Sequence, residues 1–124
     1  MLGDVLIEFQ CSKCGNPLTH RLVEKPDDVE FCEPDGEDLL AQGLAARDFE
    51  WHDGQWVINR NDRRGMDVIK DPSRCNGCCD LDGIDGFNLV CMRCSKEVAT
   101  AKLDCWMPHY ILLDTNRTNV IEVQ

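Results

Sequence analysis

Short runs in which apolar and polar residues alternate recur along the sequence and predict a mainly β fold. VLIEFQ (5–10) and LTHRLVE (18–24) come first, and FNLV (87–90), KEVATAKL (96–103) and WMPHYILLD (106–114) follow much later. Between them, FEWH (49–52) and QWVIN (55–59) flank Asp53-Gly54, a pair that readily forms a two-residue type I′ turn. These runs predict a small antiparallel β-sheet.

One segment departs from this pattern and predicts a short helix. In EDLLAQGLAARD (37–48) the apolar residues fall near helical spacing, and Asp35 stands where an N-cap is expected. Gly43 weakens the helix, because glycine has a poor helix propensity. The stretches 59–67 and 71–86 read as loops, since Gly, Asp, Asn and Pro dominate them. We expect residues 115–124 to form a tail or an edge strand, and residues 1–124 to form a single domain.

Charge and composition narrow the classes of function. The chain carries 13 basic and 23 acidic side chains, a formal net charge of −10. Nucleic-acid binding draws most of its affinity from Lys and Arg on phosphates, so we expect no nucleic acid and favour a basic protein partner. MLGDVLIEFQ (1–10) has Asp4 and Glu8 inside its apolar run and no basic leader. It predicts neither a secretory signal nor a membrane span, and hence a cytoplasmic protein.

Nine cysteines are the strongest chemical signal in the sequence. Disulfides are rare in reducing compartments, and an odd number of cysteines leaves one thiol without a partner. Two residues between cysteines let a tight turn aim both sulfurs at one ion, and structural zinc usually takes four such ligands. The sequence therefore predicts one structural Zn²⁺ ion, with two ions as the alternative. Three pairs have this spacing: Cys11 and Cys14, Cys75 and Cys78, and Cys91 and Cys94.

The residues around each pair favour one ligand set. FQCSKCGNPLTHRL and LVCMRCSKEVATAKL place β-prone residues before and after the cysteines, whereas the middle pair lies in a turn-rich loop. We therefore expect the ligands Cys11, Cys14, Cys91 and Cys94. An alternative ligand set uses Cys75 and Cys78 in place of Cys11 and Cys14. It is supported by the twelve residues between Cys78 and Cys91, which come close to the spacing of a local four-cysteine site.

The remaining cysteines are weaker candidates. Cys79, Cys105 and His109 form a candidate second metal site, which Cys75 and Cys78 would complete. However, positions four apart on a strand, such as Cys105 and His109, are separated by roughly 13 Å. Packing is therefore the preferred interpretation of Cys105. We expect Cys79 to pack or to serve as an alternate ligand, and Cys32 to be a small buried residue.

CSKCG and CMRC, on separate hairpins far apart in a small β protein, resemble two groups of zinc proteins. These are the zinc ribbons and the β-tent group, which includes the Yippee-like and methionine sulfoxide reductase B folds. The resemblance implies a β domain clamped by zinc. It implies no reductase activity, because the chain lacks a counterpart of the reductase's Arg-x-Cys-x-Asn nucleophile segment. The stretch 75–106 also resembles a segment of small uncharacterised bacterial proteins, which implies no activity.

These features together favour a non-enzymatic protein-interaction module built around structural zinc. Four cysteines close a zinc site, and no catalytic residues stand out. Two alternatives remain open. One is a zinc-fold redox or hydrolytic enzyme using Cys79 or Cys105, although no Cys-x-x-Cys pair has a thioredoxin-like setting. The other is an acidic inhibitor or immunity-type protein that binds a basic enzyme.

Overall fold

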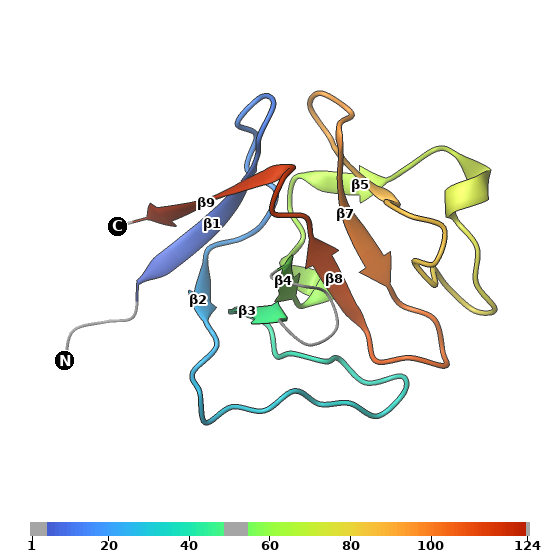
Figure 1. Cartoon of the computed structure of the whole chain (residues 1–124), viewed down its shortest axis with the longest axis horizontal. Coiled ribbons are helices and arrows are strands. Elements are labelled where there is room, and N and C mark those ends of the chain that lie inside the picture. Colours follow the sequence, from blue (N-terminus) through green and yellow to red (C-terminus); the bar gives the residue numbers. More distant parts are fainter. Residues whose placement is uncertain (1–4, 49–54, 124) are drawn as a thin grey trace.

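The strands form one curled, mixed β-sheet (Figure 1). The computed structural model describes residues 5–48 and 55–123. Within these ranges nine strands follow the order β5-β6-β7-β8-β4-β3-β2-β1-β9, and no helix is long and apolar enough to cross a membrane. The mainly β fold class is therefore confirmed. The elements are β1 (Leu6–Cys11), β2 (Leu22–Glu24), β3 (Leu44–Asp48), β4 (Gln55–Ile58), η1 (Arg60–Asp62), β5 (Met66–Val68), η2 (Pro72–Arg74), β6 (Leu89–Cys91), β7 (Glu97–Lys102), β8 (Tyr110–Leu113) and β9 (Thr118–Val123), where η marks a 3₁₀-helix.

Most of the predicted strands are present. β1, β2, β4, β6, β7 and β8 each lie in or overlap a run that the alternating pattern selected. β5 overlaps the end of the stretch 59–67, which the sequence predicts to be a loop, and β9 pairs with β1 at one edge of the sheet. FEWH (49–52) and the Asp53-Gly54 turn lie outside the described residues, although β3 and β4 on either side form an antiparallel pair.

One pair of neighbouring strands is parallel, so the sheet is mixed and not antiparallel throughout as predicted. β2 and β3 run in the same direction, with Val23 opposite Leu44, whereas the other described pairs are antiparallel. Parallel strands need a long crossover between them. Residues 25–43 supply it as an extended segment along the lower edge of Figure 1.

The helix predicted over 37–48 is wrong, because this crossover pairs with the rest of the molecule instead. Leu39 donates its N–H to the carbonyl of His109 (2.9 Å), and His109 donates its N–H to Glu37 (2.8 Å). Leu39 and the neighbouring Leu40 are both fully buried. Gly43, at φ 88°, ends the segment before β3 begins. Tertiary pairing and burial outweigh a weak helix propensity.

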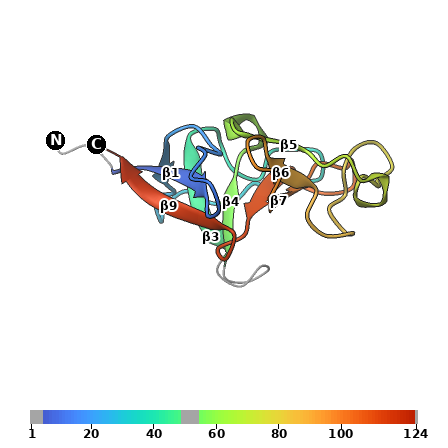
Figure 2. The same ribbon diagram turned by 90° about the horizontal axis from the view of Figure 1, so that it is seen from above.

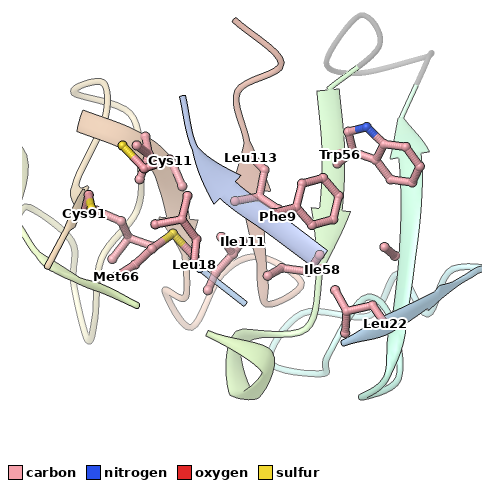
Figure 3. Packing of buried hydrophobic residues seen from close by; sticks show 14 of the residues in the cluster. Phe9, Cys11, Leu18, Leu22, Trp56, Ile58, Met66, Cys91, Ile111 and Leu113 are labelled. Atoms are coloured by element: carbon pink, nitrogen blue, oxygen red, sulfur yellow. The ribbon is translucent and has the colours of Figure 1, made fainter. Parts of the chain in front are cut away.

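The hydrophobic core lies on both faces of the central strands β4 and β8. On one face the rings of Phe9 and Trp56 meet edge to face, with centroids 5.3 Å apart (Figure 3). On the other face Leu39 and Leu40 pack in a cluster with Val57 of β4. Successive residues of a strand point to opposite faces, and this double burial explains why β8 is apolar at every position.

The burial of the crossover generates a first prediction. Leu39→Ala should lower the free energy of unfolding by about 2–4 kcal/mol, because it removes a fully buried side chain and leaves a cavity against the sheet. Gln42→Ala, an exposed position on the same segment, is the matched control and should change it by no more than about 0.5 kcal/mol. Urea unfolding followed by circular dichroism measures both. Equal effects would contradict the packing of the crossover against the sheet.

Candidate metal centre

Two tight turns with the same backbone geometry carry the outer cysteine pairs; we call them knuckles. The first knuckle (11–16) follows β1 and the second (91–96) follows β6. In the first, Gly15 donates its N–H to the carbonyl of Cys11 at 2.9 Å; in the second, Ser95 donates to Cys91 at 2.9 Å. Gly15 and Ser95 have similar positive φ angles, 76° and 65°. The two Cys-x-x-Cys pairs are therefore presented by equivalent backbones.

The knuckles bring four sulfur atoms together. The Sγ atoms of Cys11 and Cys94 lie 3.5 Å apart, and those of Cys14 and Cys91 lie 3.6 Å apart. The ligand atoms of the four cysteines all lie within 4.8 Å of one another. Four sulfurs at 2.3 Å from a tetrahedral zinc ion are separated by about 3.8 Å. The donor set and its spacing therefore fit a tetrahedral, thiolate-binding metal ion.

This four-sulfur cluster lies at the border between core and solvent. Cys11 and Cys91, the first cysteine of each knuckle, are 1% and 0% exposed and belong to the hydrophobic core, whereas Cys14 and Cys94 are partly exposed. Figure 3 shows Cys11 and Cys91 beside Leu18 and Met66. In Figure 1 the two knuckle loops project side by side at the top of the molecule. An ion held here is covered by apolar side chains on its inner side.

Gly65 joins the two knuckles, and sequence reasoning did not identify it. Its carbonyl accepts the N–H of Met92 in the second knuckle at 2.9 Å and the side-chain amide of Asn16 in the first at 3.3 Å. Its N–H donates to Leu18 at 3.1 Å. A Cβ atom on residue 65 would lie 1.8 Å from the carbonyl oxygen of Pro17. The isolated glycine directly before β5 is the signal of this close backbone approach.

Hydrogen bonds to sulfur favour the thiolate form of Cys91. The N–H of Arg93 and the amide of Asn16 lie 3.4 Å and 3.6 Å from its Sγ. Burial by itself would raise the pKa of Cys91, but backbone N–H groups of the knuckle and the thiols of Cys14 and Cys94 outweigh it. The pKa of Cys91 is thereby lowered to about 7. The thiolate of Cys91 therefore supplies one negative charge to the cluster near neutral pH.

Cys14 holds its proton more tightly than an ordinary cysteine. The backbone N–H of Asn16 acts to lower its pKa, but burial and the neighbouring sulfurs, Cys91 first among them, raise it to about 11. Thiolates this close repel one another, so the first charge disfavours a second. A divalent cation removes this repulsion and displaces the remaining protons.

The alternative ligand set, with Cys75 and Cys78 in place of the first knuckle, is not assembled. Cys75 is exposed, and its thiol lies 3.4 Å from the carbonyls of Ile69 and Asp71. Cys78 lies instead in a separate group with Cys79 and Cys105. Cys32 is exposed, so the expectation that it is buried is wrong. It lies on the crossover, whose outer side faces solvent.

Cys105 does not pack in the core as expected; it is exposed, and its Sγ lies 2.9 Å from that of Cys79. A hydrogen bond with Cys79, burial and the nearby thiols raise the pKa of Cys105 to about 12. His109, expected beside it as a ligand, is outside the three-sulfur group. Its Nε2 lies 3.1 Å from the carbonyl oxygen of Asp104. A carbonyl only accepts hydrogen bonds, so Nε2 carries the proton.

Comparisons of the chain with protein-family models, with curated proteins and with solved structures find no match.

A substitution at Gly65 tests how the knuckles are joined. Gly65→Ala should lower the free energy of unfolding by at least about 2 kcal/mol and the metal affinity by about 10–100-fold, because the new Cβ forces the backbone away from Pro17. Competition with a chelator of known affinity measures the second effect. Gly36→Ala is the control: it has φ 81° and open space around it. It should cost about 1 kcal/mol in stability and leave the metal affinity unchanged. Equal loss of metal affinity in both variants would contradict the role of Gly65.

The lowered pKa of Cys91 predicts pH-dependent proton release. Below its pKa of about 7 Cys91 is protonated in the metal-free protein and must lose a proton to bind a metal, whereas above that pH it is already a thiolate. Metal binding at pH 8 should therefore release about one proton fewer than at pH 6, and the affinity should fall as the pH decreases. Calorimetric titration in buffers of different ionisation enthalpy measures the proton count. An equal count at both pH values would contradict the shifted pKa.

Proposed function

We propose that this chain binds one structural Zn²⁺ ion and acts as a non-enzymatic protein-interaction module. The observation that carries the metal assignment is the convergence of four cysteine sulfurs, with contacts of 3.5 Å and 3.6 Å between the knuckles. All-sulfur tetrahedral donor sets are typical of structural zinc. The bound ion supplies a positive charge and four bonds that hold the knuckles together. The zinc-ribbon or β-tent-like character belongs to the same proposal, and the equivalent knuckles support it.

A structural role for the ion is favoured over catalysis by zinc. Four protein sulfurs leave no coordination place for water or substrate. The enzyme alternative would use Cys79 or Cys105 as a nucleophile, and nucleophilic cysteines are thiolates at neutral pH. The pKa of Cys105, raised to about 12, counts against this use.

The partner proposed for this module is a basic protein. Six exposed acidic residues lie on the crossover, which contributes a strongly negative strip to a chain of net charge −10. Opposite charge accelerates association and selects partners. The inhibitor alternative relies on the same strip, and it differs in that its partner is an enzyme that loses activity on binding. We place the protein in the cytoplasm, where nine thiols stay reduced. The acidic residues are Asp27, Asp28, Glu30, Glu33, Asp35 and Glu37.

Replacing ligands of the four-sulfur cluster tests the metal proposal. Cys14→Ser and Cys91→Ser should each lower the zinc content and the melting temperature together, because structural zinc contributes roughly 10–16 kcal/mol of apparent binding free energy. Elemental analysis and thermal unfolding measure the two quantities. Cys32→Ser removes an exposed thiol outside the cluster and should change neither. If the first two variants kept full zinc content and stability, those residues would be removed from the site.

Charge-neutral variants test the proposed partner. The immobilised, zinc-loaded protein serves first to isolate partners, and the affinity of each purified partner is then measured at about 0.05 M and about 0.3 M ionic strength. We expect the affinity to fall with salt, and to fall further for Asp27→Asn/Glu30→Gln than for Asp67→Asn/Glu122→Gln, which neutralises two exposed acids elsewhere. A partner that is insensitive to salt and to both variants would contradict a basic partner bound by the crossover.

A further inference from the structure

A second group of sulfurs stands apart from the four-sulfur cluster. The ligand atoms of Cys78, Cys79 and Cys105 lie within 4.8 Å of one another, and the group shares no residue with the knuckles. All three cysteines are exposed. They come from two loops, one after η2 and one between β7 and β8. We refer to this group as the open triad.

A single buried carboxylate fixes the backbone of both loops. Asp104 is 0% exposed, and its two oxygens accept the N–H groups of Cys78, Cys79 and Cys105 at 2.7, 2.9 and 2.8 Å. The indole N–H of Trp106 also donates to it, at 2.8 Å. Every cysteine of the open triad is thus bound through its own backbone to the same side chain. The backbone positions that carry the three sulfurs are therefore fixed in advance of any ligand.

Gly77 is the residue that allows the first loop to close on this carboxylate. It has φ 154°, and a Cβ atom there would lie 1.7 Å from the carbonyl of Asp80 and 3.0 Å from Oδ2 of Asp104. The loops are also joined where Leu103 donates its N–H to Leu81 at 2.7 Å. Neither contact involves the four-sulfur cluster, so the open triad has its own structural support.

We propose that the open triad binds a second Zn²⁺ ion whose fourth coordination position is open to solvent or to an incoming ligand. Three cysteine sulfurs, with no fourth ligand in the group among residues 5–48 and 55–123, are the donor set of an open zinc site, whereas four close the site. The Sγ atoms of Cys79 and Cys105, now 2.9 Å apart, must separate by about 1 Å to reach the sulfur spacing around zinc. Their exposed side chains have the rotational freedom to do so.

Charge favours zinc over copper(I), the other ion that soft thiolates select. Three thiolates leave a net charge of −1 around Zn²⁺ and −2 around Cu⁺, and the buried carboxylate of Asp104 lies directly beneath them. The divalent ion offsets more of this negative charge. Because the fourth position is accessible, the second ion should exchange faster than the ion enclosed by the knuckles.

Zinc content and release kinetics of the full chain test this proposal. The reduced protein is saturated with Zn²⁺, passed through a desalting column, and examined by native mass spectrometry and by transfer of zinc to a chromogenic chelator. We expect two zinc ions, one released in a fast phase and one in a slow phase. Cys79→Ser and Cys105→Ser should each lose the ion that is released in the fast phase and keep the ion that is released in the slow phase. Their melting temperature should equal that of the wild-type protein with only the slowly released ion bound.

Cys75→Ser is the matched control, because Cys75 is an exposed cysteine of the same loop and lies outside the open triad. It should keep both ions. The proposal is overturned if the wild-type chain binds one zinc ion, if Cys75→Ser loses the second ion as readily as Cys79→Ser, or if competitive loading under anaerobic conditions places copper(I) at this position. Cys14→Ser separates the two sites, because it should lose the slow ion alone. The presence or loss of the rapidly released ion therefore tests the open triad independently of the four-sulfur cluster.

Discussion

The structure depends on one constraint: the ends of β1 and β6 must meet, although these strands are far apart in the sheet. They are the eighth and second strands in the sheet order. In a flat sheet, six steps between neighbours would separate them by about 29 Å. Their knuckle sulfurs lie 3.5 Å and 3.6 Å apart, so the sheet must curl until its two halves face one another. Figure 2, which views the molecule from above, shows β1 and β9 in one half and β5, β6 and β7 in the other.

Several short-range contacts stabilise this curled form of the sheet. Thr19 and Arg63 form an isolated antiparallel bridge, and Gly65 contacts both knuckles. The buried cysteines Cys11 and Cys91 belong to the same hydrophobic cluster as Phe9. A metal ion at the sulfurs would add roughly 10–16 kcal/mol, which is comparable with the whole net stability of a typical domain at about 5–15 kcal/mol. The hydrophobic core determines the curled shape of the sheet, and the proposed ion would stabilise that shape against unfolding.

Sequence reasoning succeeded where the signal is local. A Cys-x-x-Cys turn between β-prone residues fixes its own geometry, so the strands and knuckles could be predicted from short windows. The helix at 37–48 failed because Leu39 is held by His109, a partner 70 positions away. β5 was missed because its three residues follow a polar, Gly-containing stretch. The meeting of Cys79 with Cys105 was equally hidden, because it depends on Asp104, whose carboxylate looks unremarkable in the sequence.

The long separation between the knuckles also has a consequence for biosynthesis. Cys11 and Cys94 are 83 positions apart, and a ribosome adds about 5–20 residues per second. The first pair of thiols therefore emerges seconds before its counterpart exists. β1 also cannot pair with its neighbour β9 until that strand, which is translated later still, has been synthesised. A nascent chain that ends before Cys94 can complete neither this sheet edge nor the four-sulfur cluster, so both must wait until strands far apart in the sequence have been synthesised.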